Sequence, residues 1–111
     1  MEPSLLRRAF FAGLRSGLKV VWPILSALLV AIVALGAAVA LLEDWPLRNG
    51  IYFAFVTGLT IGYGDLVPKQ PLSRTLAIVI GIIGVLLIGL VTAVAVRALE
   101  RLGEEGRETR Q

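Results

Sequence analysis

The residues with the clearest chemical potential form a run of six, Thr-Ile-Gly-Tyr-Gly-Asp, at positions 60–65. Glycine accepts positive φ, so glycines that alternate with L-residues let successive backbone carbonyls point the same way. A ring of carbonyl oxygens from several chains can replace the hydration shell of a cation. The run lies between two long apolar segments. Irregular backbone at membrane depth is tolerated only where protein buries it or where it lines a watery cavity. The pattern therefore predicts an ion-binding loop in a membrane pore.

The composition favours a membrane protein. Of the 111 residues, 57% are hydrophobic and 17% are charged, whereas a soluble domain has roughly 45–50% and about 25%. There is no cysteine and no histidine, which removes disulfides, thiolate metal sites, the usual general base and the usual pH switch. The net charge of +3 would suit a nucleic acid, but the basic residues flank apolar runs, as is typical of membrane-adjacent charge. We therefore expect no nucleic-acid partner and no cofactor, with the permeant ion as the ligand.

Two apolar runs are long enough to cross a bilayer. The first predicts an outer helix over residues 20–42, with Trp22 at the interface and Pro23 in the first turn. A cleaved signal peptide is an alternative, because Ala-Val-Ala at 38–40 imitates a cleavage site, but the apolar run is longer than a typical signal sequence. The second run predicts an inner helix over residues 73–97. Together the two runs predict an all-α membrane protein.

A short segment between the two runs predicts a re-entrant helix. The sequence Glu-Asp-Trp-Pro at 43–46 ends the first run, and Asp44 is expected to cap a new helix with Pro46 in its first turn. The predicted helix, 46–58, is too short to span the bilayer. It ends beside Thr60, so its partial negative charge would face the loop and favour a cation. A buried connecting helix without an electrostatic role is the alternative.

Both terminal arms are charged. In residues 1–19, basic residues surround an apolar stripe at every fourth position, formed by Leu6, Phe10, Leu14 and Leu18. This pattern predicts an interfacial helix that would contact anionic lipid. A basic flank with some helical content is the alternative, because Gly13 and Gly17 weaken the helix. Residues 98–111 carry opposite charges at three- and four-residue spacing, which predicts a helical tail. A proton-sensing cluster of glutamates is the other interpretation of the tail.

The charge distribution predicts the topology. Four basic residues precede the first apolar run and four arginines follow the second, whereas the central part has three basic and three acidic residues. The positive-inside rule then places both termini in the cytoplasm and the 60–65 loop towards the outside. We expect a multi-pass protein of the cell membrane.

The six residues at 60–65 resemble the TVGYGD selectivity filter of potassium channels, with Ile61 in place of the valine. With the flanking runs, residues 20–97 resemble the pore module of prokaryotic two-transmembrane potassium channels. The resemblance implies a homotetramer that conducts potassium passively through a selective filter. The implied potassium ligands are the hydroxyl of Thr60 and the backbone carbonyls of four residues, Thr60, Ile61, Gly62 and Tyr63.

The resemblance also implies supporting roles beside the filter. Gly64 and Asp65 complete the motif, and Tyr52 is expected to donate a hydrogen bond to Asp65 at the outer mouth. Two residues depart from the pattern of better-known relatives. Val56 stands where some members carry a glutamate that pairs with the filter aspartate, and Leu59 replaces a threonine. Neither departure changes an ion-coordinating residue.

The inner run contains three glycines, and Gly84 is the expected gating hinge because its distance from the filter resembles that of the hinge in related channels. Gly81 and Gly89 are alternatives for the hinge. Small residues also let helices approach closely in lipid, so a packing role for all three glycines is the other interpretation.

The sequence also has features of other functional classes. A weakly selective cation channel of the same fold would be suggested by changes at Tyr63 or Gly64, and both are intact. The sequence Gly-Tyr-Gly-Asp also matches the GxGD pattern of intramembrane aspartyl proteases, which need a second membrane aspartate. The only other aspartate, Asp44, lies at a predicted membrane edge. A structural membrane hairpin is a further alternative, but in such a protein the Thr-Ile-Gly-Tyr-Gly-Asp order would be a coincidence. We therefore expect a channel and no enzyme, either as a minimal pore or as a trimmed one.

Overall fold

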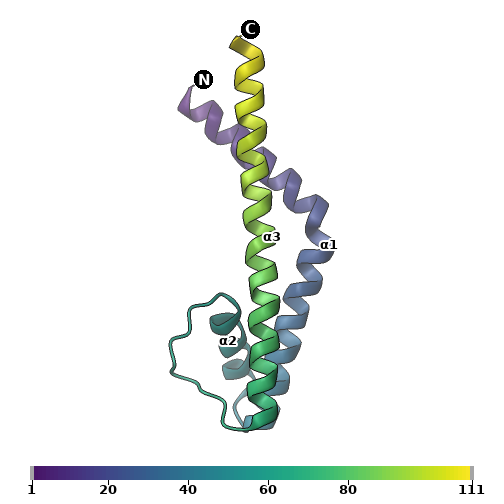
Figure 1. Ribbon diagram of the computed structural model, residues 1–111, viewed down its shortest axis with the longest axis vertical. Coiled ribbons are helices and arrows are strands. Elements are labelled where there is room, and N and C mark those ends of the chain that lie inside the picture. The colour runs from purple at the N-terminus through teal and green to yellow at the C-terminus, as the bar shows by residue number, and fades with distance from the viewer. Residues whose placement is uncertain (1, 111) are drawn as a thin grey trace. The chain divides into compact units, whose positions relative to one another are not determined.

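The computed structural model describes residues 2–110, with side chains described for residues 2–104. It contains three helices, α1 (Pro3–Glu43), α2 (Leu47–Gly58) and α3 (Pro71–Arg110) (Figure 1). All regular secondary structure in the described residues is helical, so the predicted all-α class is confirmed. The two long helices, α1 and α3, are long and apolar enough to cross a membrane.

The chain divides into two compact units, and both long helices contribute to each. One unit comprises residues 24–88 and contains α2 and the loop that follows it. The other comprises residues 1–23 and 89–111. The two units are described separately below.

Helix α1 is continuous from Pro3, so the arm expected at 1–19 and the span expected from residue 20 belong to one helix. Pro23 lies in the interior of this helix, and the prediction that it occupies a first turn is wrong. Proline has no N–H to donate to the carbonyl four residues earlier, here that of Lys19. The boundary between the two compact units also falls at Pro23. The backbone ladder of α1 is therefore interrupted where one unit ends.

The turn between α1 and α2 is built around Asp44. Asp44 has a φ of 60°, and the N–H of Trp45 donates to the carbonyl of Ala40 at 2.9 Å. A left-handed residue followed by this hydrogen bond is the Schellman arrangement that ends helices. Pro46 is the N-cap of α2, which has no side-chain capping hydrogen bond. The expectation that Asp44 caps α2 is therefore wrong, because Asp44 terminates α1 instead.

Small residues bring α1 and α2 together in the unit of residues 24–88. A Cβ on Gly36 would lie 2.7 Å from the carbonyl oxygen of Gly50 and 2.8 Å from the Cβ of Ala54. A Cβ on Gly50 would meet the Cβ of Ala40 at 2.5 Å. Such contacts are typical of helix pairs in lipid, where close backbone approach replaces the hydrophobic effect as the driving force. Helix α2 is thereby fixed against α1.

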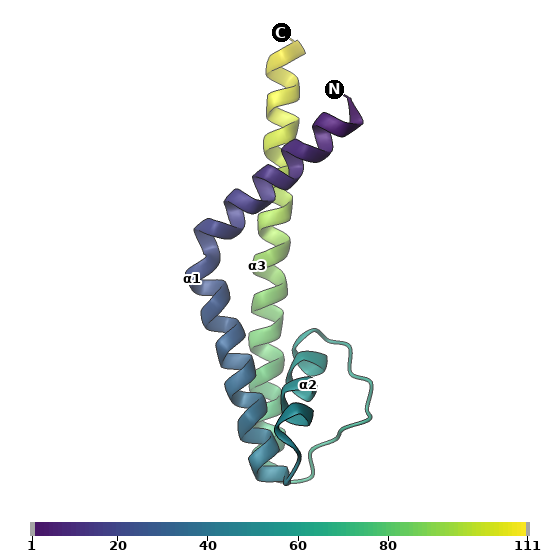
Figure 2. The same cartoon turned by 180° about the vertical axis from the view of Figure 1, so that it is seen from behind.

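The unit of residues 1–23 and 89–111 is a pair of helical segments. The N-terminal part of α1 lies across the C-terminal part of α3 in both views (Figures 1 and 2). Val94 and Ala98 of α3 are buried, and both pack against glycines of α1. This packing supports a helical N-terminal arm despite its two glycines.

Candidate functional site

The loop that follows α2 is held by the last turn of that helix. The N–H groups of Ile61 and Gly62 both donate to the carbonyl of Val56, at 2.9 and 3.2 Å. In a trans peptide the preceding carbonyl points opposite to the N–H, and the described residues contain no cis peptide bond. The carbonyls of Thr60 and Ile61 therefore both point away from Val56. Two successive carbonyls share one direction at the start of the motif.

The backbone of the loop alternates in conformation. Positive φ occurs at every second residue, with 61° at Thr60, 59° at Gly62 and 80° at Gly64. Ile61 and Tyr63, which lie between these residues, do not have a positive φ. A β-branched residue with positive φ is a genuine outlier, and such strain persists where the surrounding structure imposes it, often at functional sites. The hydrogen bonds to Val56 define the carbonyl direction at Thr60 and Ile61, and the alternation in φ continues through Gly64.

The two loop glycines are required by conformation and not by packing. A Cβ on Gly62 or Gly64 would meet no atom within 4 Å. The side chains of the intervening residues are also uncovered in a single chain, with Ile61 47% and Tyr63 68% exposed. The hydroxyl of Thr60 donates to the carbonyl of Leu59 at 2.6 Å. In a single chain the backbone of the loop therefore has a defined conformation, whereas the side chains of Ile61 and Tyr63 are largely exposed.

Tyr52 of α2 and Asp65 at the end of the motif lie together, as the resemblance implied. The hydroxyl of Tyr52 donates a hydrogen bond to the Asp65 carboxylate, and this bond is the main cause that raises the pKa of Tyr52. Tyr52 is about half-exposed. The hydrogen bond joins the C-terminal end of the motif to the middle of α2.

Replacing Tyr52 by phenylalanine is expected to make the loop of residues 60–65 less stable, because the Asp65 carboxylate loses its hydrogen-bond donor. The expected result is a severalfold faster decline of ion flux with time, with the helices intact. Asp65→Asn is the matched variant from the other side of the bond. The double variant should be no worse than the poorer single variant, since contacting residues are not additive. If ion flux through Tyr52→Phe declined no faster than flux through the unaltered chain, the result would count against this role.

The exit from the loop is tied to the end of α1. The carboxylate oxygen Oε1 of Glu43 accepts the N–H of Lys69 at 2.6 Å and that of Gln70 at 2.9 Å. The side-chain amide of Gln70 donates to the carbonyl of Leu42 at 2.5 Å. Glu43 was not among the site residues predicted from the sequence, because its partners are distant in sequence. The only feature of the sequence that could have indicated this role is the charge of Glu43 at the end of the first apolar run.

Replacing Glu43 by alanine is expected to loosen this exit. The amides of Lys69 and Gln70 should then exchange hydrogen with solvent faster, because their common acceptor is gone. Glu43→Gln keeps an oxygen acceptor without the charge and should give an intermediate effect. Hydrogen exchange measured by mass spectrometry on the peptide that covers the loop checks this. Protection equal to that of the unaltered chain in Glu43→Ala would contradict the assignment.

Gly84 lies against the end of α2. A Cβ on Gly84 would overlap the carbonyl oxygen, carbonyl carbon and Cα of Gly58. A Cβ on Gly81 or Gly89 would meet nothing within 4 Å. Helix α3 continues without a break through all three glycines. This geometry supports the packing interpretation for Gly84, and the hinge role stays a prediction. Gly58, the partner in this contact, was not among the residues predicted from the sequence.

An apolar hollow of about 440 Å³ is lined by Thr60 and by residues of α3. Its lining residues are Thr60, Ile78, Gly81, Ile82, Val85 and Leu86. Thr60 supplies the only hydroxyl among these residues. The large apolar side chains that line it are more than half exposed in a single chain.

Two membrane-spanning helices flank a short helix and a loop with alternating positive φ. This arrangement defines the pore module of a membrane channel. A family model described as "Ion channel" matches residues 27–101. The chain belongs to this ion channel family, so it is a membrane protein with two spans and not an enzyme. Pore domains of this family assemble as multimers. The membrane-protease interpretation is thereby set aside.

Curated relatives agree with this assignment. The chain is 38% identical over 58 residues to two-pore potassium channel 5 of Arabidopsis thaliana, covering 48% of this chain and 14% of the relative. It is 35% identical over 81 residues to two-pore potassium channel 3 of the same plant, covering 61% of this chain and 19% of the relative. The chain thus spans less than a fifth of the length of these relatives. No solved structure matches the chain with comparable significance.

Proposed function

We propose that the chain forms a potassium-selective channel in which four copies surround one pore. The observation that carries the proposal is the backbone of residues 60–64, where φ is positive at alternate residues and two N–H groups bound to Val56 direct the carbonyls of Thr60 and Ile61 to one side. Four such loops would stack rings of oxygens from Thr60, Ile61, Gly62 and Tyr63. Such rings replace the hydration shell of potassium. The relatives named as potassium channels support the same ion.

The remaining parts of the chain take their roles from this arrangement. Residues 20–42 form the membrane part of the outer helix, 46–58 the pore helix and 73–97 the inner helix, as in prokaryotic two-transmembrane channels. Gly64, Asp65 and Tyr52 support the filter. By the positive-inside rule, the basic arms favour a cell-membrane protein with both termini in the cytoplasm. Anionic lipid would contact the basic N-terminal segment.

Assembly is supported by what a single chain leaves uncovered. The large side chains of the filter are exposed, and unpaired backbone groups of the loop would face lipid in a lone chain. Each unsatisfied backbone group in hydrocarbon costs several kcal/mol. In a ring with closed cyclic symmetry, the neighbouring copies cover the same exposed groups in every copy.

The test is ion flux through the purified chain in liposomes. Uptake of potassium and rubidium that barium blocks, with little sodium uptake, is the expected result. Equal sodium flux would point to the weakly selective alternative. Absence of flux, both from the unaltered chain and from variants that open the inner helices, would overturn the channel proposal. Crosslinking in the liposomes, with a ladder that stops at four chains, checks the stoichiometry.

A further inference from the structure

Two residues that weaken helices mark the limits of the unit formed by residues 1–23 and 89–111. Its limit in α1 falls at Pro23, and its limit in α3 falls at Gly89. Proline cannot donate a backbone hydrogen bond inside a helix, and glycine stabilises a helix less than alanine does. Each long helix therefore passes from one unit to the other at a residue where bending costs little.

Packing within the chain does not account for Gly89. A Cβ at this position would meet no atom within 4 Å, and the residue is exposed in a single chain. Gly84, the hinge expected from the sequence, is instead buried against Gly58 in the unit of residues 24–88. Of these two glycines of α3, Gly89 is therefore the one at which the backbone can bend without breaking a close contact.

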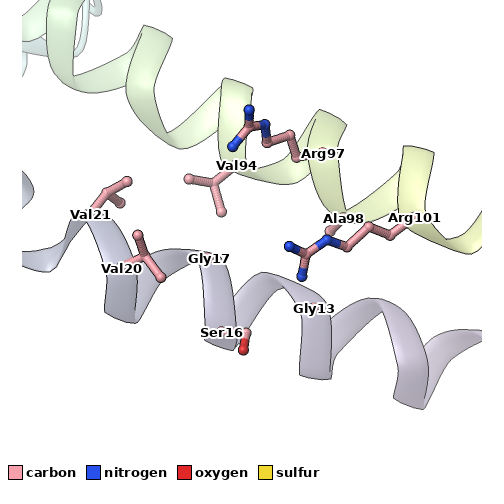
Figure 3. A pocket seen from close by; sticks show the side chains of 9 residues that line it. All are labelled: Gly13, Ser16, Gly17, Val20, Val21, Val94, Arg97, Ala98 and Arg101. Carbon is pink, nitrogen blue, oxygen red and sulfur yellow. The ribbon is translucent and has the colours of Figure 1, made fainter.

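The two helical segments of the unit of residues 1–23 and 89–111 are packed tightly on each other. A Cβ on Gly17 would lie 2.7 Å from Cγ1 of Val94, and one on Gly13 would lie 3.4 Å from the Cβ of Ala98. Val94 and Ala98 are 7% and 4% exposed. Figure 3 shows both residues on the side of α3 that faces these glycines. Contacts as close as these resist sliding, so the two segments form one body.

We propose that residues 1–23 and 89–111 move as one body when the pore opens, with α1 bending at Pro23 and α3 bending at Gly89. A bend in only one of the two helices would separate the packed segments, whereas a bend in both helices preserves their contact. The end of the inner helix then carries the N-terminal arm with it, and the outer helix takes part in opening. This inference rests on the proposed function, because it concerns the opening of that pore.

The first test links the two segments covalently. In the double variant Gly13→Cys, Ala98→Cys the two Cβ atoms are 3.4 Å apart, close to the separation of about 3.5–4.5 Å found in disulfides. The chain has no cysteine of its own. Oxidation in liposomes should leave barium-sensitive rubidium flux unchanged, because the segments do not part during opening. Loss of flux on oxidation that a reductant restores would overturn the proposal, since opening would then require the segments to separate.

The second test stiffens each helix where it bends. Pro23→Ala restores an N–H donor for the carbonyl of Lys19 and should lower rubidium flux by about tenfold. Pro3→Ala is the matched control, because Pro3 is the first residue of α1, where the N–H has no partner in the helix. Gly89→Ala should lower flux by about fivefold, whereas Gly81→Ala, which also has no neighbour, should not. Normal flux through both Pro23→Ala and Gly89→Ala would overturn the proposal.

Hydrogen exchange of the assembled chain gives a readout that needs no conduction, so it separates a wrong hinge from a pore that does not conduct potassium. Amides next to Pro23 and Gly89 should exchange faster than those of residues 28–40, because a helix opens locally where it bends. Pro23→Ala should slow exchange at the bend of α1. Uniform protection through both bends would overturn the proposal, whatever ion the pore conducts.

Discussion

Replacing Gly62 by alanine is expected to abolish selective potassium flux. Gly62 has a φ of 59°, and its Cβ would meet no neighbouring atom. The penalty is therefore one of backbone conformation, roughly 1–2 kcal/mol for an L-residue held in the left-handed region. If four chains must hold this conformation together, the penalties add to about 4–8 kcal/mol. Fewer than about one assembly in a thousand would then keep the filter geometry.

The measurement is barium-sensitive rubidium uptake into liposomes at matched amounts of assembled protein. Gly103→Ala is the control, because it adds a methyl group to a helical glycine of α3 that also has no neighbour within 4 Å. It should conduct like the unaltered chain. D-alanine at position 62, introduced by semisynthesis, adopts positive φ freely and should restore flux. Normal, selective flux through Gly62→Ala would refute the role given to positive φ.

Replacing Gly84 by alanine is expected to cost most of the stability of the contact between α2 and α3. The added Cβ would overlap three backbone atoms of Gly58, and backbone cannot rotate away as a flexible side chain can. Overpacking of this kind typically costs about 1–3 kcal/mol and occasionally more. The change acts at the helix end that positions the filter, so conduction should fall together with stability.

Thermal unfolding in detergent and the assembly state by size-exclusion chromatography check this expectation. Gly81→Ala is the matched control, one turn earlier on α3 and without a neighbour. It should be neutral or slightly stabilising, because alanine is a better helix former than glycine. The pair also separates two interpretations of Gly84. A hinge predicts altered gating at normal stability in Gly84→Ala, whereas close packing predicts a loss of stability.

The order of helices and the position of the loop were predictable from the sequence, because both depend on local signals. Charge-free runs give the spans, and the short segment before Thr60 gives the re-entrant helix. The contact of Tyr52 with Asp65 followed from the family resemblance. The sequence separation of Tyr52 and Asp65 alone would not have suggested this contact.

The features that the sequence did not reveal depend on contacts between distant residues or on competing local signals. Glu43 and Lys69 meet only after the loop has folded back to the end of α1. Asp44 has the side chain of a helix N-cap, but it also tolerates positive φ, and the end of α1 uses the second property. The close approach of Gly58 to Gly84 cannot be read from either glycine by itself, since small residues are common throughout both helices.

The exposed Ile61 and Tyr63 side chains have a thermodynamic consequence for the protein in a bilayer. If neighbouring copies supply the missing cover, the folded loop and the assembled pore share one equilibrium. Stability then obeys mass action, so the melting temperature should fall when the protein is diluted with lipid. A chain diluted below the dissociation range would keep α1, α2 and α3, whereas the backbone at residues 60–65 would lose the stabilisation that neighbouring copies supply. Ion binding, which requires that backbone, would in turn draw the copies together.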